Sequence, residues 1–396
     1  MRTNRYLTTT VLALATACAP ADDAPEPGAD SDARVYVETL GADTMAIERF
    51  TRGDDRIDGT LVTRAPLTEV HRYGAQLGAD GSVTRLTGTI SVPSANAGAR
   101  PDRFYEYVVR GDSADIVTVS GTDTTRTTIA VPEGALPVPP RTPAPPSFLE
   151  LATERLGEGT PDAVLNLVNP FAGQPTPSGL SRRDDGTVGI LYFGSPLLVT
   201  RGADGALRTV SGRETTMRIE VAPADTVLDV EALAGGYAAR DAAGTGVGVP
   251  SPADTARGTV AGSELEVAYS QPAARGRELW GGLVPFGSVW RTGANAATTL
   301  ATASDIELGG IAVPAGEYTL WTLFSEDGGE LIVNTQTGQW GTAYDEAQDL
   351  ARVGLEMESN EEFVERFTIG LEGEADGGRL TLSWGDRTYF VPIAPG

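Results

Sequence analysis

Residues 69–77 (EVHRYGAQL), 82–92 (SVTRLTGTISV) and 103–110 (RFYEYVVR) decide the fold of this chain. In each run, apolar and polar side chains alternate with a period of two, which is typical of a β-strand with one buried face. Turn-forming residues separate the runs, as at Ala79-Asp-Gly81 and Gly111-Asp-Ser113. Short strands joined by such turns predict an antiparallel meander.

The alternating pattern begins at residue 34 and resumes after residue 187. Between the two sets lies a proline-rich segment, residues 132–146, in which a regular hydrogen-bond ladder is unfavourable because proline has no N–H. A short helical part follows it. We therefore expect residues 34–233 to form one domain, a curved antiparallel sheet or half-barrel with short helices packed on it.

The helical part is predicted to be a pair of short helices. Ser147 followed by Glu150 resembles a capping box, and Gly157 can end the helix that starts there. A second helix is expected over residues 161–168, with Pro161 in its first position.

Residues 234–257 are rich in Gly, Ala, Pro and Ser, which predicts a linker between two domains. The alternating pattern then returns in residues 258–396, where short apolar runs are separated by Gly and Asp. A chain of short strands in so few residues favours a β-sandwich or a jelly-roll. The predicted fold class is therefore mainly β, in two domains.

Composition excludes several classes of chemistry. The 396 residues carry a net charge of −24, every cation is an arginine, and the chain has one histidine, His71, and one cysteine, Cys18. Without lysine there is no Schiff base and no Walker-type phosphate lysine. One histidine and one cysteine cannot form the usual zinc, iron–sulfur or haem sites, and the negative charge disfavours nucleic acid. We expect no metal and no cofactor.

The first residues resemble a bacterial lipoprotein signal. Arg2 and Arg5 precede a short apolar run, residues 7–17, which is too short to span a bilayer and leads directly into Cys18. The resemblance implies that residues 1–17 are cleaved as a signal peptide and that Cys18 is lipidated. An ordinary secretory signal, with Cys18 incidental, is the alternative.

The residues after the cysteine extend this prediction. Residues 18–33 are rich in Pro, Ala and Asp and predict a disordered tether. Ala19 stands where the resemblance implies sorting to the outer membrane. The expected partner of this end is therefore the membrane, through the lipid on Cys18, with the protein in the cell envelope facing the periplasm.

A second resemblance rests on residues 275–295, RGRELWGGLVPFGSVWRTGAN, followed by VPAGEY at 313–318, Asn334 and Trp340-Gly341. These segments are similar to the bacterial domain of unknown function 2911 family over about residues 258–396. The family implies a secreted or lipoprotein β domain. It implies no activity.

The same segment supplies the candidate site. Arg291 and Asn295 offer donors and acceptors, and Trp290, Trp340 and Tyr344 offer aromatic faces, a combination that suits a small polar ligand such as a sugar or a carboxylate. The alternative is that these residues pin glycine-rich loops inside a β-sandwich.

Other candidates are weaker. His71, alone in its strand, is expected to be at the surface or half-buried. Paired acids such as Asp345/Glu346 and Glu361/Glu362 could serve glycoside hydrolysis if they faced one cleft. The leading hypothesis is a ligand- or partner-binding lipoprotein rather than an enzyme; a carbohydrate-active hydrolase and a carrier of apolar lipid or lipoprotein in the first domain are the alternatives.

Overall fold

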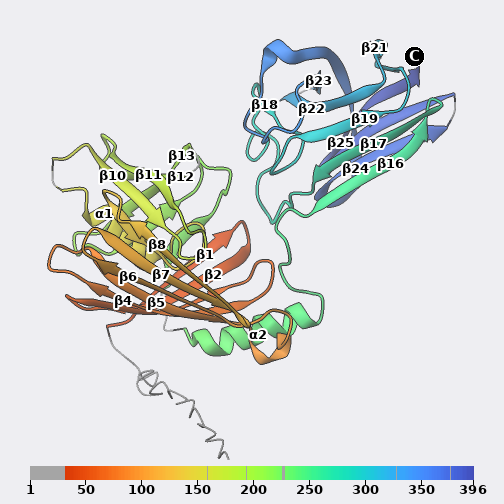
Figure 1. The fold of residues 1–396 in the computed structure, drawn as a ribbon. Helices are drawn as coiled ribbons and strands as arrows, with labels where there is room; N and C mark the ends of the chain where they lie inside the picture. The colour runs from red at the N-terminus through yellow and green to blue at the C-terminus, as the bar shows by residue number, and fades with distance from the viewer. Residues whose placement is uncertain (1–31, 158, 193, 225–227, 327, 375) are drawn as a thin grey trace, which may run out of the picture.

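The structure is a computed structural model that describes residues 32–396 except 158, 193, 225–227, 327 and 375 (Figure 1). The signal peptide, Cys18 and residues 18–31 of the tether lie outside the described residues, so the lipoprotein assignment stays a prediction. In the described part of the chain, no helix has the length and apolar character needed to cross a membrane.

The described residues form two separate β-sheets, as the mainly β prediction required (Figure 1). Sheet A, with two α-helices, makes up what we call the N-terminal domain, and sheet B the C-terminal domain. Sheet A is curved and open, with fifteen strands in the order β8-β7-β6-β5-β4-β3-β2-β1-β15-β14-β13-β12-β11-β10-β9. Its strands are β1 (Arg34–Leu40), β2 (Asp43–Arg52), β3 (Arg56–Thr63), β4 (Glu69–Leu77), β5 (Val83–Ser91), β6 (Arg103–Arg110), β7 (Ser113–Ser120), β8 (Asp123–Ala130), β9 (Ala135–Pro137), β10 (Asp162–Val168), β11 (Pro175–Arg182), β12 (Val188–Tyr192), β13 (Ser195–Arg201), β14 (Leu207–Ser211) and β15 (Glu220–Pro223).

The alternating sequence pattern sets the register of sheet A. In β5, Leu86 and Ile90 are buried in the core, whereas Arg85, on the opposite face of the strand, is exposed. Gly88, on the buried face, pairs with Tyr105 of β6, whose ring occupies the space a Cβ at Gly88 would take. A one-residue slip would turn the whole apolar set toward water, so the register is strongly specified.

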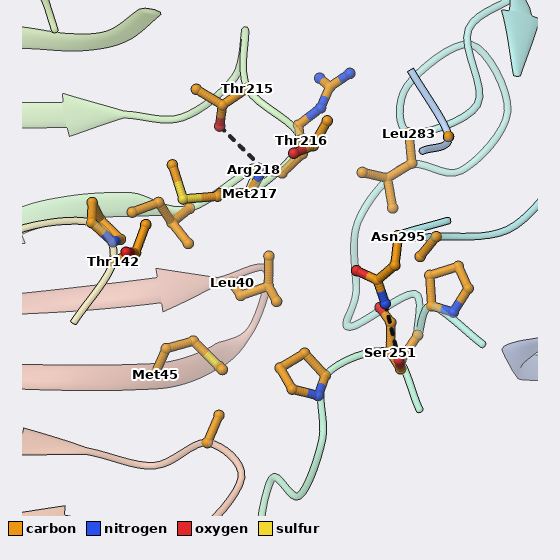
Figure 2. A pocket seen from close by; sticks show the side chains of 18 of the residues that line it. Leu40, Met45, Thr142, Thr215, Thr216, Met217, Arg218, Ser251, Leu283 and Asn295 are labelled. Atoms are coloured by element: carbon orange, nitrogen blue, oxygen red, sulfur yellow. Dashed lines mark hydrogen bonds between the residues drawn. The ribbon is translucent and has the colours of Figure 1, made fainter. Parts of the chain in front are cut away.

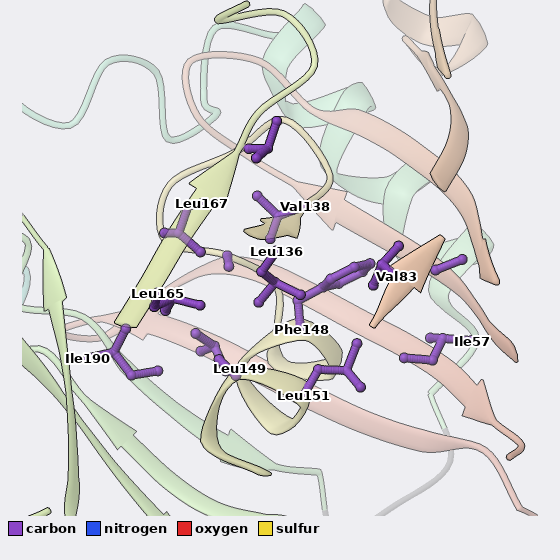
Figure 3. Close-up of a cluster of buried hydrophobic side chains, with 14 of the residues drawn as sticks. Ile57, Val83, Leu136, Val138, Phe148, Leu149, Leu151, Leu165, Leu167 and Ile190 are labelled. Atoms are coloured by element: carbon purple, nitrogen blue, oxygen red, sulfur yellow. The ribbon is translucent and has the colours of Figure 1, made fainter. Parts of the chain in front are cut away.

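Helix α1 (Pro146–Glu154) packs against sheet A and fills its core (Figure 3). Phe148, Leu149 and Leu151 are all at most 2% exposed and lie in one cluster with strand residues such as Leu165 and Ile190. Burial of each such side chain is worth about 1.5–3 kcal/mol. A carrier needs open apolar space beneath this helix, and the packed side chains argue against that alternative.

The start of α1 differs from the predicted capping box. The N-cap is Pro145, and Ser147 is the second residue of the helix, fully buried. Its N–H and Oγ donate to Glu48 on β2, at 2.9 and 2.8 Å. Glu150 likewise points into the core and accepts hydrogen bonds from Arg34 and Tyr36, at 2.5 and 3.0 Å. The serine and the glutamate therefore anchor the helix to the sheet.

The second predicted helix, residues 161–168, is wrong. Asp162–Val168 is strand β10, antiparallel to β11 and parallel to β9. Val164 is 50% exposed whereas Leu165 is fully buried, so the side chains alternate as in a strand. Hydrogen bonds to a neighbouring strand on each edge stabilise the strand more than Pro161 favours a helix start.

A helix lies instead in the segment that reads as a linker. Helix α2 (Val230–Ala242) begins at Asp229, whose side chain accepts a hydrogen bond from the Ala232 N–H at 2.9 Å. Val230 and Ala234, one turn apart, pack on the outer face of sheet A against Ile47. The chain then passes into strand β16 of the second domain (Figure 1).

Sheet B has ten strands in the order β16-β17-β19-β22-β23-β24-β25-β20-β21, with β18 paired to β22. The edge strand β16 also contacts β24, so the sheet folds back over one shared core that contains Trp384 and Phe367. The strands are β16 (Ala253–Val260), β17 (Ser263–Ser270), β18 (Val289–Trp290), β19 (Thr298–Thr302), β20 (Ile306–Leu308), β21 (Ile311–Val313), β22 (Gly316–Ser325), β23 (Gly328–Asn334), β24 (Asp349–Glu374) and β25 (Gly377–Pro395). Short 3-10 turns occupy η1 (Ser94–Asn96) and η2 (Glu346–Gln348).

The two domains touch at the turn between β1 and β2. The Ala42 N–H donates to the Arg275 carbonyl at 2.8 Å, and the Arg275 guanidinium forms an ion pair with Asp43. Arg275 is held from its own domain by Glu365, which accepts its backbone N–H at 2.8 Å. This contact places one end of sheet A opposite the loops of the C-terminal domain.

Candidate functional site

A cavity of about 750 Å³ lies between the two domains. Figure 2 shows strand ends and the 215–218 loop of the N-terminal domain on one side and Leu283 and Asn295 of the C-terminal domain on the other. The segment that carries the family resemblance, residues 275–295, thus supplies much of one wall. Apolar side chains from both domains line the space, among them Leu40 of the N-terminal domain and Leu283 of the C-terminal domain.

The C-terminal wall is fixed by Trp290 in β18. Its half-buried ring stacks on Trp384, with centroids 6.0 Å apart, and meets Phe367 edge-on at 5.2 Å. The next residues turn sharply, because Thr292 and Asn295 have positive φ angles of 53° and 62°. The Thr292 carbonyl accepts a hydrogen bond from the Thr298 hydroxyl at 2.7 Å, which holds this uncommon backbone in place.

Arg291 enters the cavity wall without a protein partner. Among the described residues it has no hydrogen bond or ion pair, and its Nε is buried and unpaired. Gly341 provides the room for it, since a Cβ there would overlap the Arg291 stem. Burial lowers the pKa of Arg291, and Arg218 across the cavity acts in the same direction. The guanidinium nevertheless stays charged at neutral pH.

The other predicted site residues divide into two groups. Asn295 lines the cavity, and its Nδ2 makes only long hydrogen bonds to Ser251 and Ser270, at 3.4 and 3.3 Å. Trp340 is 54% exposed and does not line the cavity. Tyr344 lies elsewhere too. The structure thus brings together Trp290, Arg291 and Asn295, and leaves Trp340 and Tyr344 outside.

Tyr344 has a structural environment of its own. Its ring packs on Trp321, with centroids 5.0 Å apart. Its hydroxyl donates to Asp349 at 2.7 Å and accepts from Arg352 at 3.0 Å. Burial, followed by the Asp349 carboxylate, raises the pKa of Tyr344 to about 12. These contacts give Tyr344 a structural role, which is to hold its loop in place.

The N-terminal wall contains residues that the sequence did not reveal as a site. His71, expected at the surface or half-buried, is 2% exposed and lines the cavity. Neither ring nitrogen has a hydrogen-bond partner, since Glu69 lies 3.7 Å from Nε2. Burial lowers the pKa of His71 against the opposite effect of Glu69, and Arg141 and Arg103 act in the same direction as burial, so the ring is neutral at pH 7. The alternation in β4 was the available signal, because Glu69, His71 and Tyr73 share its buried face.

Arg141 and Glu38 stand beside His71 in this wall. Arg141 Nη2 donates to both carboxylate oxygens of Glu38, at 2.8 and 2.7 Å, whereas its Nη1 is buried and unpaired. Arg141, Arg291 and the buried His71 all line the cavity, and each has a buried polar atom without a hydrogen-bond partner. Unpaired buried polar groups cost about 1–3 kcal/mol each, so such a concentration calls for an explanation.

The paired acids do not converge on this cavity. Asp345 accepts a hydrogen bond from the Ala347 N–H in η2, and Glu346 pairs with Arg352 at 2.9 Å. Glu361 and Glu362 are exposed on β24, and none of the four acids lines the cavity. Within the described ranges, no group of three or more metal-ligating side chains is assembled.

Comparison with known proteins gives a domain family and little more. No curated protein matches the chain. A crystal structure of a DUF1089 family protein from Pseudomonas aeruginosa matches with 13% identity over 42% of this chain and 90% of that chain, at a TM-score of 0.31. The family model described as "Protein of unknown function (DUF2911)" matches residues 251–393, and the C-terminal domain thus belongs to that family, as the sequence predicted.

Proposed function

We propose that this chain is a lipid-anchored protein of the cell envelope that binds a small polar ligand in the cavity between its domains. The observation that carries the proposal is that Arg291 and Asn295 line this cavity, the first with no side-chain hydrogen bond or ion pair among the described residues and the second with only long hydrogen bonds. A bound ligand would satisfy these groups, whereas a purely structural role would pair them within the protein.

Binding is favoured over the two alternatives by specific observations. The paired acids considered for a hydrolase lie away from the cavity, and the carboxylates that do line it are engaged by arginines, as Glu38 is by Arg141. The apolar space required by a lipid carrier is filled by α1. The proposed ligand is therefore polar and is bound between the domains.

A screen of small polar compounds by thermal shift on the purified full-length protein in detergent tests the binding. Compounds that raise the Tm of the wild type should lose that effect in Arg291→Gln, because its guanidinium faces the cavity without a protein partner. Tyr344→Phe is the matched control, since it alters a predicted site residue outside the cavity. Compounds that still raise the Tm of Arg291→Gln but no longer raise the Tm of Tyr344→Phe would show that the site lies near Tyr344 instead of the cavity.

The proposed membrane attachment is tested by a substitution at Cys18. Cys18→Ser removes the thiol that the sequence pattern assigns to lipid attachment, so the protein should leave the membrane fraction and its signal should stay uncleaved. Fractionation and mass spectrometry of the mature N-terminus provide the readout. Unchanged membrane association of Cys18→Ser would contradict the proposed anchor.

A further inference from the structure

Three arginines meet at the interdomain cavity without carboxylate partners. Arg218 comes from the loop between β14 and β15, whereas Arg277 and Arg291 come from the C-terminal domain. Among the described residues, Arg218 and Arg291 have no hydrogen bond or ion pair. Arg277 donates only to the carbonyls of Ala274 and Ala273, at 3.0 and 2.6 Å. Arg218 and Arg291 therefore bring uncompensated positive charges to the same space, whereas the charge of Arg277 is partly offset by Glu365 and Asp43.

The carboxylates around the cavity are already used. Glu38 is held by Arg141 at 2.7 Å, and Glu214 by Arg183 at 2.6 Å. Glu69 is paired with Arg103 at 2.7 Å and with Arg100 at 3.1 Å. The cavity thus has an excess of positive charge in a chain whose net charge is −24.

Arg218 is also close enough to the other two arginines to repel both of them. Burial lowers the pKa of Arg291, and Arg218 on the opposite domain adds to the effect. Burial also lowers the pKa of Arg277, where Arg275 and then Arg218 act in the same direction and Glu365 and Asp43 oppose them. Arg218 has a φ of 53°, a left-handed conformation that non-glycine residues rarely adopt. Like charges held together across a cavity, one of them on strained backbone, are typical of a site completed by a ligand of opposite charge.

We propose that the ligand is an organic anion that bridges the domains, held by Arg218 on one side and by Arg277 and Arg291 on the other. Guanidinium groups bind carboxylate or phosphate oxygens in pairs of parallel hydrogen bonds. A cavity of about 750 Å³ is far larger than an inorganic anion, and Leu40, Met217 and Leu283 give it apolar walls for a carbon skeleton. This inference rests on the proposed function and specifies that the polar ligand is an acid.

The bridging position also predicts an effect on the domains. In the described residues the domain contact outside the cavity centres on Arg275, with the Ala42 N–H and Asp43 opposite. An anion between Arg218 and Arg291 adds a second point of attachment and removes their repulsion. Ligand binding should therefore stabilise both domains together.

The test starts with anions alone, using the full-length protein in detergent. Sodium sulfate and sodium chloride are compared at equal ionic strength by thermal unfolding of the wild type, Arg218→Gln, Arg291→Gln and Arg213→Gln. Arg213 is the matched control, an exposed arginine of the same loop that does not line the cavity. Arg277 is left unchanged because its bonds to backbone carbonyls also hold the fold.

Sulfate should raise the Tm of the wild type and of Arg213→Gln by about 3–5 °C more than chloride does. That difference should be lost in Arg218→Gln and Arg291→Gln. In the absence of multivalent anions, Arg218→Gln should melt above the wild type, since it relieves the repulsion. The same sulfate response in all four proteins, which would reflect only general salt stabilisation, overturns the inference.

The organic part of the ligand is tested with adipate and 1,6-hexanediol, which share a six-carbon chain but differ in charge. Calorimetric titration at constant ionic strength should show binding of adipate, weakened at least about tenfold in Arg218→Gln, and none of the diol. A sulfate effect without adipate binding would reduce the site to inorganic anions and overturn the organic assignment. If uncharged polar compounds from the screen bind and Arg218→Gln leaves them unaffected, the anion inference falls while the proposed binding function stands.

Discussion

Two polar clusters buried in the described part of the chain differ in whether their atoms have hydrogen-bond partners. Beneath α1, the Glu48 carboxylate accepts hydrogen bonds from the Ser147 N–H and hydroxyl, at 2.9 and 2.8 Å, and from the Tyr73 hydroxyl. At the cavity, both ring nitrogens of His71 and the Nε of Arg291 have none. The first cluster is complete within the protein and the second is not.

This difference separates structure from function on physical grounds. A buried polar group with hydrogen-bond partners recovers much of its desolvation free energy, whereas one without partners bears the full cost. Proteins retain such costs mainly where binding repays them, as at ligand sites. The cluster at Glu48 therefore stabilises the fold, and the cluster at the cavity fits the binding role that we propose.

The largest expected effect is the change in the free energy of unfolding with pH that the titration of Glu48 causes. Burial raises the pKa of this carboxyl to about 7, although the hydrogen bonds from Tyr73 and Ser147 oppose the shift. Between pH 4.5 and 7 the unfolded chain has lost the proton that the folded chain keeps. Stability from this group is therefore fully present below pH 4.5 and is lost as the pH rises toward 7, by roughly 3 kcal/mol.

Glu48→Gln should flatten this part of the profile, measured as the free energy of unfolding in urea from pH 4.5 to 7. The comparison must be with the wild type, because burial also raises the pKa of Glu150 and adds a slope of the same sign. Glu69, whose pKa is lowered to about 2 by His71, Arg103 and Arg100 against the effect of burial, acts instead below pH 4.5. An identical slope in wild type and variant would show that Glu48 does not titrate in this range.

A smaller effect is expected at Tyr73. Tyr73→Phe removes the hydroxyl that donates to Glu48 and contacts the Ser147 hydroxyl at 2.8 Å, while the ring stays packed on Phe148. Loss of a hydrogen bond to a buried carboxyl should lower the free energy of unfolding by about 2 kcal/mol. Urea unfolding at pH 7 measures it. A cost below about 0.5 kcal/mol would mean that the cluster at Glu48 is not satisfied as described.

The strands were predictable because their signal is local. Alternation over residues 82–92 and 103–110 places Leu86, Ile90 and Tyr105 on the buried face, and the structure confirms that pattern in β5 and β6. The same reasoning failed for β10, where a proline at residue 161 resembled a helix start. The partners that make Asp162–Val168 a strand are β9 and β11, and such pairing depends on other parts of the chain.

Helix α2 was missed for a different reason. Gly235 and Gly236 lower its intrinsic helix propensity, so the segment resembles a linker by composition. Its local signals were Asp229 as N-cap and the spacing of Val230 and Ala234. The stabilising contact, with Ile47 of β2, is distant in sequence.

The site was predictable on one side. The residues after Trp290 are distinctive in sequence, and Arg291 and Asn295 do face the cavity. Trp340 and Tyr344 were grouped with them by residue type, which says nothing about direction. The opposite wall, with His71 and Arg218, comes from the other domain, and no spacing within one segment could bring it to this place.

The smallest effect is expected at His71, two residues from Tyr73 on the same face of β4. Replacing a buried group that has no hydrogen bonds by an apolar ring removes an unsatisfied desolvation cost, and the adjoining cavity leaves space for it. His71→Phe should therefore leave the free energy of unfolding unchanged or raise it by up to about 1 kcal/mol, in contrast to Tyr73→Phe. If His71→Phe instead destabilises the protein as strongly as Tyr73→Phe, the histidine belongs to the fold and the distinction between the two clusters fails.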